Sequence, residues 1–126
     1  EACLPLLGLI AAGEPIEALE TPNSVTVPSS LVRPDNFVLQ VKGQSMIDEQ
    51  IQDGDYIVVK KTATARSGQI VVAIINDEAT LKCYVPKSDR IELHPRNPKF
   101  PIITIKKTDN FYINGVLLYS FREYAS

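Results

Sequence analysis

Short apolar runs rich in β-branched residues recur along this chain, and turn-forming residues separate them. Such runs predict β-strands, because β-branched side chains pack well on a pleated sheet while Gly, Pro, Asn and Asp interrupt it. One stretch, 47–51, is typical of a short helical turn. The sequence therefore predicts an all-β fold with short helical turns. The expected strands are 37–41, 56–60, 69–75, 79–84, 90–93, 102–106, 111–113 and 116–121.

Two pairs of these strands are predicted to form hairpins. Residues 69–75 and 79–84 are joined by the turn-forming residues 76–78. Asn114-Gly115, between the last two expected strands, is the dipeptide most typical of a two-residue hairpin turn. The final strand, 116–121, is then expected at the edge of the sheet, where it can pair with another chain.

The composition indicates one small domain. The chain has 126 residues, 44% of them hydrophobic, and a net charge of −2, which fits a single modest core. This balance offers no basic face, so direct binding of nucleic acid by this chain is not expected. The apolar stretch 4–13 has no basic region before it and is too short to span a bilayer, which argues against a signal peptide or an anchor.

Ser45 is a candidate nucleophile because of where it lies in the predicted structure. It follows the strand 37–41 and Gly43, and it precedes the helical turn 47–51. At such a junction glycine leaves room for another chain, and free N–H groups at the start of the turn can stabilise an oxyanion. A serine at a strand-to-helix junction is also a common N-cap, and this feature alone leaves that alternative open.

Lys82 is a candidate general base for Ser45, because serine-lysine pairs are an alternative to Ser-His-Asp. It lies in the second strand of the first hairpin, where Thr80, Lys82 and Tyr84 share one face. A lysine takes up a proton only in its neutral form, which burial among apolar neighbours favours. The hypothesis therefore requires a buried lysine. The plainer alternative is a strand lysine that faces solvent.

Other nucleophile and metal patterns are weaker. Cys3 and Cys83 do not form a metal motif, and no disulfide can be assigned to them from the sequence. Cys83 lacks a plausible histidine partner, since the single histidine, His94, lies at the end of another strand. We expect neither a metal nor a cofactor.

Four motifs, in order and at suitable spacing, carry a resemblance to a known family. They are Leu9-Ile10-Ala11-Ala12-Gly13-Glu14-Pro15, Gly43-Gln44-Ser45-Met46, Asp53-Gly54-Asp55 and Thr80-Leu81-Lys82. Over essentially its whole length the sequence resembles the C-terminal domain of the LexA repressors, self-cleaving transcription regulators of the bacterial SOS response to DNA damage. The resemblance implies a compact β domain similar to LexA and signal peptidase, and a serine protease activity directed at the chain itself.

The resemblance also implies a role for particular residues. Ser45 would be the nucleophile, Lys82 the general base, and Ala12-Gly13 the scissile bond. The remaining implied residues are Gln44 and Ser45 as the backbone oxyanion hole, and Leu9, Ile10 and Ala11 as the part of the cleavage segment that is recognised.

The expected organisation comes from the same resemblance. Residues 1–126 would form one self-cleavage and dimerisation domain, with a cleavage segment (1–21), a connecting stretch (22–36) and a catalytic β core (37–126). Pro22, Pro28 and Pro34 mark the connecting stretch as irregular. The chain starts at Glu1 rather than Met, so we expect it to lack the DNA-binding N-terminal domain of its parent. Implied partners are a second copy through the C-terminal strand, a RecA filament on single-stranded DNA, and operator DNA only through the missing domain, in the bacterial cytoplasm and away from membranes.

Three alternatives remain open from the sequence. A UmuD-like accessory subunit of translesion synthesis and a phage-type repressor share the serine-lysine site, so the site cannot separate them from a LexA-type repressor. The sequence upstream of Glu1 would separate a repressor from an accessory subunit, because a DNA-binding domain indicates the former and a short arm the latter. A purely structural β-domain leaves the cleavage segment unexplained.

Overall fold

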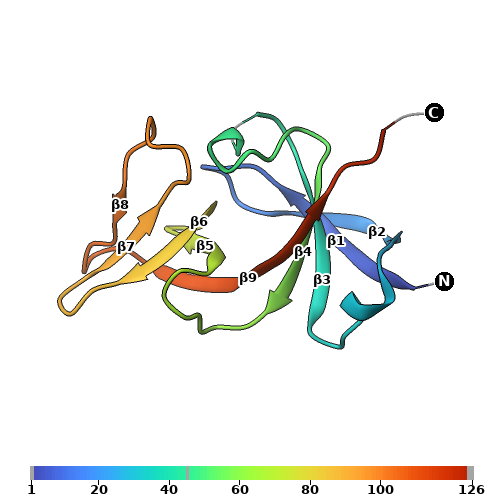
Figure 1. Ribbon diagram of the computed structural model, residues 1–126, viewed down its shortest axis with the longest axis horizontal. Coiled ribbons are helices and arrows are strands. Elements are labelled where there is room, and N and C mark those ends of the chain that lie inside the picture. Colours follow the sequence, from blue (N-terminus) through green and yellow to red (C-terminus); the bar gives the residue numbers. More distant parts are fainter. Residues whose placement is uncertain (1, 45, 125–126) are drawn as a thin grey trace.

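A computed structural model of the protein describes residues 2–44 and 46–124. Its strands form one sheet in the order β2-β1-β3-β4-β9-β5-β6-β7-β8, in which β1 and β3 are parallel and all other neighbours are antiparallel (Figure 1). The predicted all-β class is confirmed. The strands are β1 (Cys3–Ile10), β2 (Glu17–Thr26), β3 (Asn36–Val41), β4 (Tyr56–Lys61), β5 (Ile70–Ile75), β6 (Glu78–Pro86), β7 (Ile91–His94), β8 (Ile103–Thr104) and β9 (Phe111–Phe121), and the short 3₁₀ turns are η1 (Ser29–Leu31) and η2 (Ile47–Glu49).

The burial of each strand agrees with its sequence pattern. In β1, Leu4 and Leu6 alternate with exposed positions, as expected for a strand with one face on the core. In β5 almost every residue is apolar and buried, because this strand has a hydrophobic cluster on each face. Val72 packs in the larger cluster and Val71 in the cluster on the opposite face.

The sheet curls so that its two halves face each other. Glu14, which comes after β1, forms a β-bridge with Ala79 of β6, although four strands separate β1 from β6 in the sheet order. In Figure 1 the strand β9 runs diagonally from the β5–β8 group to the β1–β4 group. The largest cluster of buried residues takes side chains from both groups, including Ile10, Leu39, Ile57, Val72 and Leu81. This core therefore joins the halves.

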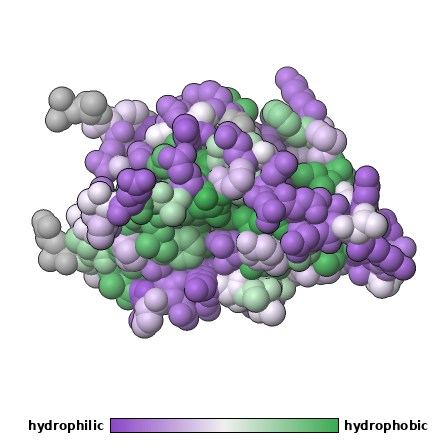
Figure 2. All heavy atoms as spheres, turned by 180° about the vertical axis from the view of Figure 1, so that it is seen from behind, coloured by the Kyte–Doolittle hydropathy of each residue, from purple (hydrophilic) through white to green (hydrophobic). Residues whose placement is uncertain are grey.

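Surface polarity is uneven across the molecule. From behind, hydrophobic residues gather toward the middle of the visible face and hydrophilic residues surround them (Figure 2). Among the described residues, no helix has the length and apolar character needed to cross a membrane.

The predicted hairpin at Asn114-Gly115 is wrong. β9 continues through both residues from Phe111 to Phe121, and its pairing with β5 skips Asn114, which makes a bulge at that point. A Cβ at Gly115 would collide with the Val59 side chain and lie 2.6 Å from the Lys60 carbonyl oxygen. The glycine is therefore needed for the close approach of β4, a role that glycines within strands often have, rather than for a turn.

The predicted edge position of residues 116–121 also needs correction. In the sheet order β9 lies between β4 and β5, so it is an internal strand. Its pairing with β5 ends at Val116, whereas its pairing with β4 continues to Phe121. Within the described sheet, residues 117–121 thus pair on one side only.

The predicted irregular connection at 22–36 differs from the structure at its start. β2 runs from Glu17 to Thr26 and includes Pro22. This strand is at the edge of the sheet, where a proline is tolerated because no neighbour needs its N–H on the open side. The segment before it, β1, is held on both sides, by β2 and by β3.

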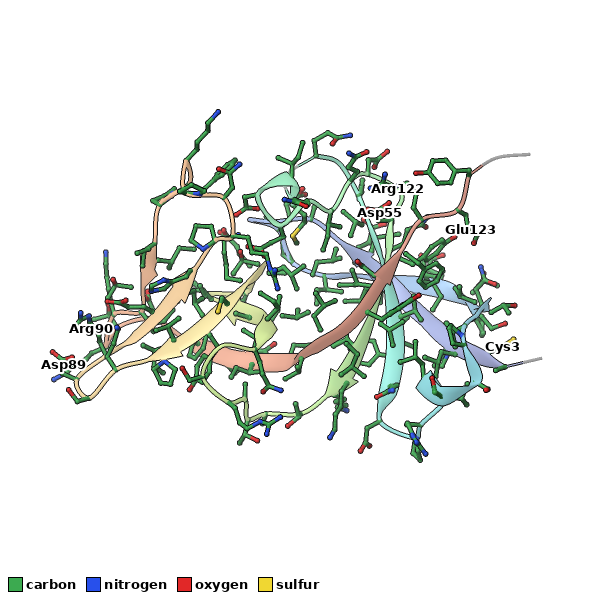
Figure 3. All side chains as sticks on the ribbon, in the orientation of Figure 1. Cys3, Asp55, Asp89, Arg90, Arg122 and Glu123 are labelled. Atoms are coloured by element: carbon green, nitrogen blue, oxygen red, sulfur yellow. The ribbon has the colours of Figure 1, made fainter. Side chains whose placement is uncertain are left out.

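The end of the chain is fastened to the turn before β4. Arg122 donates two hydrogen bonds to Asp55, from Nε to Oδ1 at 2.6 Å and from Nη2 to Oδ2 at 3.0 Å (Figure 3). Asp55 also accepts the Gln52 N–H at 2.9 Å. The hydrogen bonds from Arg122 are the main reason that the pKa of Asp55 lies below its usual value.

Candidate active site

The residues after β1 form a tight turn. The Glu14 N–H donates to the Ala11 carbonyl at 3.2 Å, which places Ala12 and Gly13 at the two central positions. Gly13 has a φ of 80°, as the third residue of a type II turn requires. The nearest described atom to a Cβ built at Gly13 is Glu78 Oε1, at 3.9 Å. Backbone conformation, not lack of space, therefore favours glycine here.

This turn is docked on the start of β6. The Gly13 N–H donates to the Ala79 carbonyl at 2.9 Å, and the Ala79 N–H donates to the Glu14 carbonyl at 2.8 Å. Ala79 lies three residues before Lys82 on the same strand. The two hydrogen bonds thus fix the Ala12–Gly13 peptide beside the strand that carries the lysine.

The parallel pairing of β1 with β3 brings a second segment to the same place. Ile10 is in register with Val41, and the Lys42 N–H donates to the Ile10 carbonyl at 2.9 Å. Since the carboxyl ends of parallel strands meet at one edge of a sheet, the turn at Ala12–Gly13 and the loop after Val41 leave the sheet side by side.

The loop after Val41 is held in shape by the turn before β4. Asp53 Oδ1 accepts the Gly43 N–H at 2.7 Å, and the Gly54 N–H donates to the Val41 carbonyl at 2.8 Å. Gly43 and Gly54 both have positive φ values, of 82° and 88°. Further along the loop Met46 is fully buried in the main core. These contacts close the loop at both ends.

Lys82 is buried and paired with an acidic residue of η2. Its side chain is 7% exposed, and its Nζ lies 2.7 Å from Asp48 Oδ2 and donates to the Leu81 carbonyl at 3.2 Å. The Asp48 side chain is 3% exposed, and its second oxygen, Oδ1, has no hydrogen-bond partner among the described residues. The burial of two ionisable groups so far from water is compensated by their contact with each other.

A second buried carboxyl comes directly after Asp48. Glu49 Oε2 accepts the Arg96 N–H at 3.0 Å, and Oε1 lies 3.4 Å from Arg96 Nε. Burial raises the pKa of Glu49, and the Arg96 N–H partly opposes that effect. The contact joins η2 to the loop between β7 and β8.

These elements surround one cavity of about 440 Å³. Ala12 and Gly13 line it together with Lys82 and Asp48, and Phe100 of the loop between β7 and β8 forms a further wall. The arrangement places a peptide bond and a buried amine at the same cavity. Chemically, an amine so placed can exchange a proton with groups reacting at that peptide.

Residues 5–118 match the model of the Peptidase S24-like family. The chain belongs to the Peptidase S24-like family. It is 51% identical over 124 residues to the LexA repressor of Syntrophotalea carbinolica, covering 98% of this chain and 61% of that protein. It is 43% identical over 122 residues to the LexA repressor of Syntrophobacter fumaroxidans, covering 96% of this chain and 59% of that protein. It is 49% identical over 111 residues to the LexA repressor of Myxococcus xanthus, covering 84% of this chain and 50% of that protein.

The predicted resemblance to LexA repressors is thus confirmed, and membership of the Peptidase S24-like family supports a serine-type, self-cleaving peptidase. The chain spans between half and about three-fifths of the length of these relatives.

The structure gathers several of the predicted site residues. Ala12, Gly13 and Lys82 meet at the cavity, while Ser45 lies outside the described residues. Gln44 is exposed, and its carbonyl accepts the Ile47 N–H at 3.2 Å. In the predicted recognition segment, Leu9 is half-buried and Ile10 and Ala11 are buried. The catalytic and recognition roles of these residues stay predictions.

Sequence reasoning missed Asp48. An acidic residue in a short polar turn is normally expected at the surface, and no periodic pattern marked η2 as buried. The available signal was proximity in the sequence: Asp48 comes three residues after Ser45, the predicted nucleophile. A buried lysine across the fold needs such a partner.

Proposed function

We propose that this chain is the self-cleaving domain of a LexA-type transcriptional repressor of the SOS response. In this proposal Ser45 and Lys82 cut the bond between Ala12 and Gly13. The observation that carries it is the shared cavity, where the turn holding Ala12–Gly13 meets a lysine whose side chain is 7% exposed. The similarity to LexA repressors favours a repressor over an accessory subunit of translesion synthesis.

The proposed reaction proceeds through an acyl-enzyme. The Ser45 hydroxyl attacks the Ala12 carbonyl carbon and passes its proton to neutral Lys82. The tetrahedral intermediate collapses, the C–N bond breaks, and Lys82 returns the proton to the nitrogen of Gly13. A water then attacks the Ala12–Ser45 ester, giving a proton to Lys82, which returns it to the serine oxygen. One water is consumed, and the products are residues 1–12 and 13–126.

The docked turn supplies the substrate at high effective concentration. Because the peptide is part of the same chain, no binding step is needed and the rate depends on conformation. In the structure the turn is held by Ala79 on β6 and, through Ile10, by the loop after Val41. We therefore propose that the described conformation is the one competent for cleavage.

Intact-mass measurement under denaturing conditions tests this function. The purified chain is incubated at neutral and at alkaline pH, beside Ser45→Ala and Lys82→Met. We expect loss of residues 1–12 from the unmutated chain alone, faster at alkaline pH, because the lysine must lose its proton. Cleavage that persists in Ser45→Ala, or a rate that does not change with pH, would count against the serine-lysine mechanism.

Gly13→Ala tests the conformation of the turn. An alanine fits the space beside Glu78 but is strained at a φ of 80°, a penalty of about 1–2 kcal/mol for a left-handed residue. We expect cleavage at least about fivefold slower, with unchanged dependence on pH. Gly68→Ala, at a φ of 93° in another loop, is the matched control and should leave the cleavage rate unaltered.

We further propose that the chain forms a homodimer through β9. Residues 117–121 pair with β4 on one side only, and Leu118 and Tyr119 are 43% and 46% exposed. An open strand edge with apolar side chains favours pairing with a second copy. A Leu118→Lys variant, which puts a charge on this apolar edge, should shift sedimentation from dimer to monomer; a dimer that survives it would argue for another interface.

The remaining parts of the proposal concern the whole repressor. Residues 1–126 would be one domain, with cleavage segment 1–21, connecting stretch 22–36 and catalytic core 37–126, acting in the bacterial cytoplasm. A DNA-binding domain outside this chain would bind the operator, and a RecA filament on single-stranded DNA would stimulate cleavage. Addition of such a filament at neutral pH should raise the cleavage rate of the unmutated chain and leave Ser45→Ala intact.

A further inference from the structure

We propose that Asp48 is a positioning residue that holds Lys82 in its charged form and thereby restrains self-cleavage at neutral pH. This inference rests on the proposed function, in which Lys82 must be neutral to take the serine proton. The Asp48 carboxylate contacts the Lys82 amine directly, so we infer that it acts on the reaction through Lys82.

The geometry of the pair supports this role. Asp48 Oδ2 lies 2.7 Å from Lys82 Nζ, and the two side chains are 3% and 7% exposed. Burial alone disfavours the charged form of a lysine, whereas a carboxylate in direct contact favours it. At such a distance and so little exposure, solvent and salt screen the attraction only weakly. The carboxylate therefore opposes the effect that would activate the lysine.

The other charged groups around the pair do not replace Asp48. Glu49 of η2 interacts electrostatically with both Lys82 and Asp48, but its Oε2 accepts the Arg96 N–H and its Oε1 lies 3.4 Å from Arg96 Nε. Glu78, at the start of β6, lines the same cavity and is exposed. On the strand beside Lys82, the residue in register is Val71, which is apolar. Asp48 is thus the carboxylate in contact with the amine among the described residues.

The second oxygen of Asp48 supports the same role. Oδ1 is buried and has no hydrogen-bond partner among the described residues. A buried carboxylate with an unsatisfied oxygen is costly, and a purely structural position is better served by a neutral side chain of similar shape. A charge at this position therefore has a cost in stability, and its counterpart in the structure is the contact with Lys82.

The first arm of the test measures the lysine without any cleavage. In a Ser45→Ala background, the Nζ resonance of Lys82 is followed against pH by ¹⁵N NMR, with and without Asp48→Asn. Asparagine keeps an oxygen acceptor and the side-chain shape but removes the charge. We expect the titration midpoint of Lys82 to fall by about one pH unit or more. An unchanged midpoint would overturn the proposal, whether or not the chain cleaves itself.

The second arm measures cleavage in the chain that retains Ser45. Asp48→Asn should cleave about tenfold faster at neutral pH and reach an alkaline plateau near that of the unmutated chain, because one pH unit corresponds to tenfold in the neutral fraction. A slower rate at every pH, with no shift of the profile, would show a merely structural role. A shifted NMR midpoint without cleavage in any variant would leave the role of Asp48 standing and overturn the proposed function.

Two further variants keep the test decisive. Asp89→Asn removes a surface charge that pairs with Arg90 at 2.8 Å, where Asp89 is 72% exposed. It should change neither the NMR titration midpoint of Lys82 nor the pH profile of cleavage. Asp48→Glu keeps the charge and lengthens the side chain, so its midpoint should stay within about half a unit of the parent. A fall of a full unit in Asp48→Glu would show that shape, not charge, controls Lys82.

Discussion

Two ion pairs connect distant parts of this chain, and they differ mainly in their exposure to water. Lys82 and Asp48 meet at 2.7 Å with side chains 7% and 3% exposed. Arg122 and Asp55 meet at 2.6 Å, but the arginine is 36% exposed (Figure 3). The distances are nearly equal, so distance alone cannot predict what either pair does.

The difference in exposure separates two functions. Asp55 is held by Arg122 and by the Gln52 N–H, so its charge is well compensated while the arginine stays in contact with solvent. Asp48 has one buried partner and one oxygen without a described partner. The exposed pair fastens the end of the chain, whereas the buried pair, in our proposal, controls the charge of a reactive amine.

Removal of the buried cation should have the largest effect on stability. Lys82→Met keeps most of the side-chain volume but leaves Asp48 buried and unpaired, which costs about 3–5 kcal/mol. Urea unfolding of Lys82→Met against a Ser45→Ala reference, neither of which can cleave itself in the proposed mechanism, measures this loss.

A matched variant and a double variant sharpen that prediction. Lys42→Met removes a lysine that is 62% exposed and lies 3.6 Å from Glu17, and should cost under about 1 kcal/mol. The double variant Lys82→Met/Asp48→Leu should recover most of the stability lost in Lys82→Met, since no buried charge remains. If the double variant is less stable than Lys82→Met, an unpaired buried carboxylate does not explain the loss in Lys82→Met and the comparison fails.

Breaking the pair at the end of the chain should have a smaller effect. Arg122→Met in the Ser45→Ala background removes two hydrogen bonds to a charged group, but water can reach the vacated side, so we expect a loss of about 1–2 kcal/mol. Arg33→Met, at an exposed position, is the control and should change the unfolding free energy by less than about 0.5 kcal/mol. A loss as large as that in Lys82→Met would remove the distinction between the two pairs.

Acid should weaken the pair at the end of the chain. The folded-state pKa of Asp55 is lowered, chiefly by the Arg122 hydrogen bonds, so its contribution is complete above the unfolded value of about 3.9 and is lost as pH falls through the folded value. The stability difference between the Ser45→Ala reference and Arg122→Met should therefore shrink below about pH 4. The pKa of Glu49 is raised, so its protonation in acid affects stability in the opposite direction. Glu49 is present in both the reference and Arg122→Met, so its contribution cancels in the difference between them.

Salt should have the smallest effect and should separate the pairs most directly. At about 1 M salt the screening length falls to about 3 Å, so the coupling energy of Arg122 with Asp55 from a double-mutant cycle should fall by a few tenths of a kcal/mol. The coupling of Lys82 with Asp48 should not change measurably. Equal losses in both cycles would mean that solvent reaches the buried pair.

The sequence predicted most strands because their apolar runs and turn residues are local signals, as at residues 69–84, where the expected hairpin corresponds to β5 and β6. It failed at Asn114-Gly115 because the same dipeptide serves a turn or a close approach between strands, and only the position of Val59 and Lys60 in β4 decides between them. The burial of Lys82 agreed with the proposed chemistry, yet its partner Asp48 could not be inferred, because their contact joins segments 34 residues apart.

The position of β1 determines the state of the molecule after cleavage. The strand lies inside the sheet, hydrogen-bonded to β2 and β3, and Leu4, Leu6 and Ile10 are buried. In the proposed reaction, a cut between Ala12 and Gly13 would open the chain but leave that hydrogen-bond ladder in place. The cleaved molecule would then consist of two pieces, with β1 bound as a peptide, and the departure of that peptide would be a separate dissociation with its own rate. Hydrolysis of the peptide bond would thus be irreversible, whereas release of the cleaved peptide from the sheet would remain a reversible equilibrium.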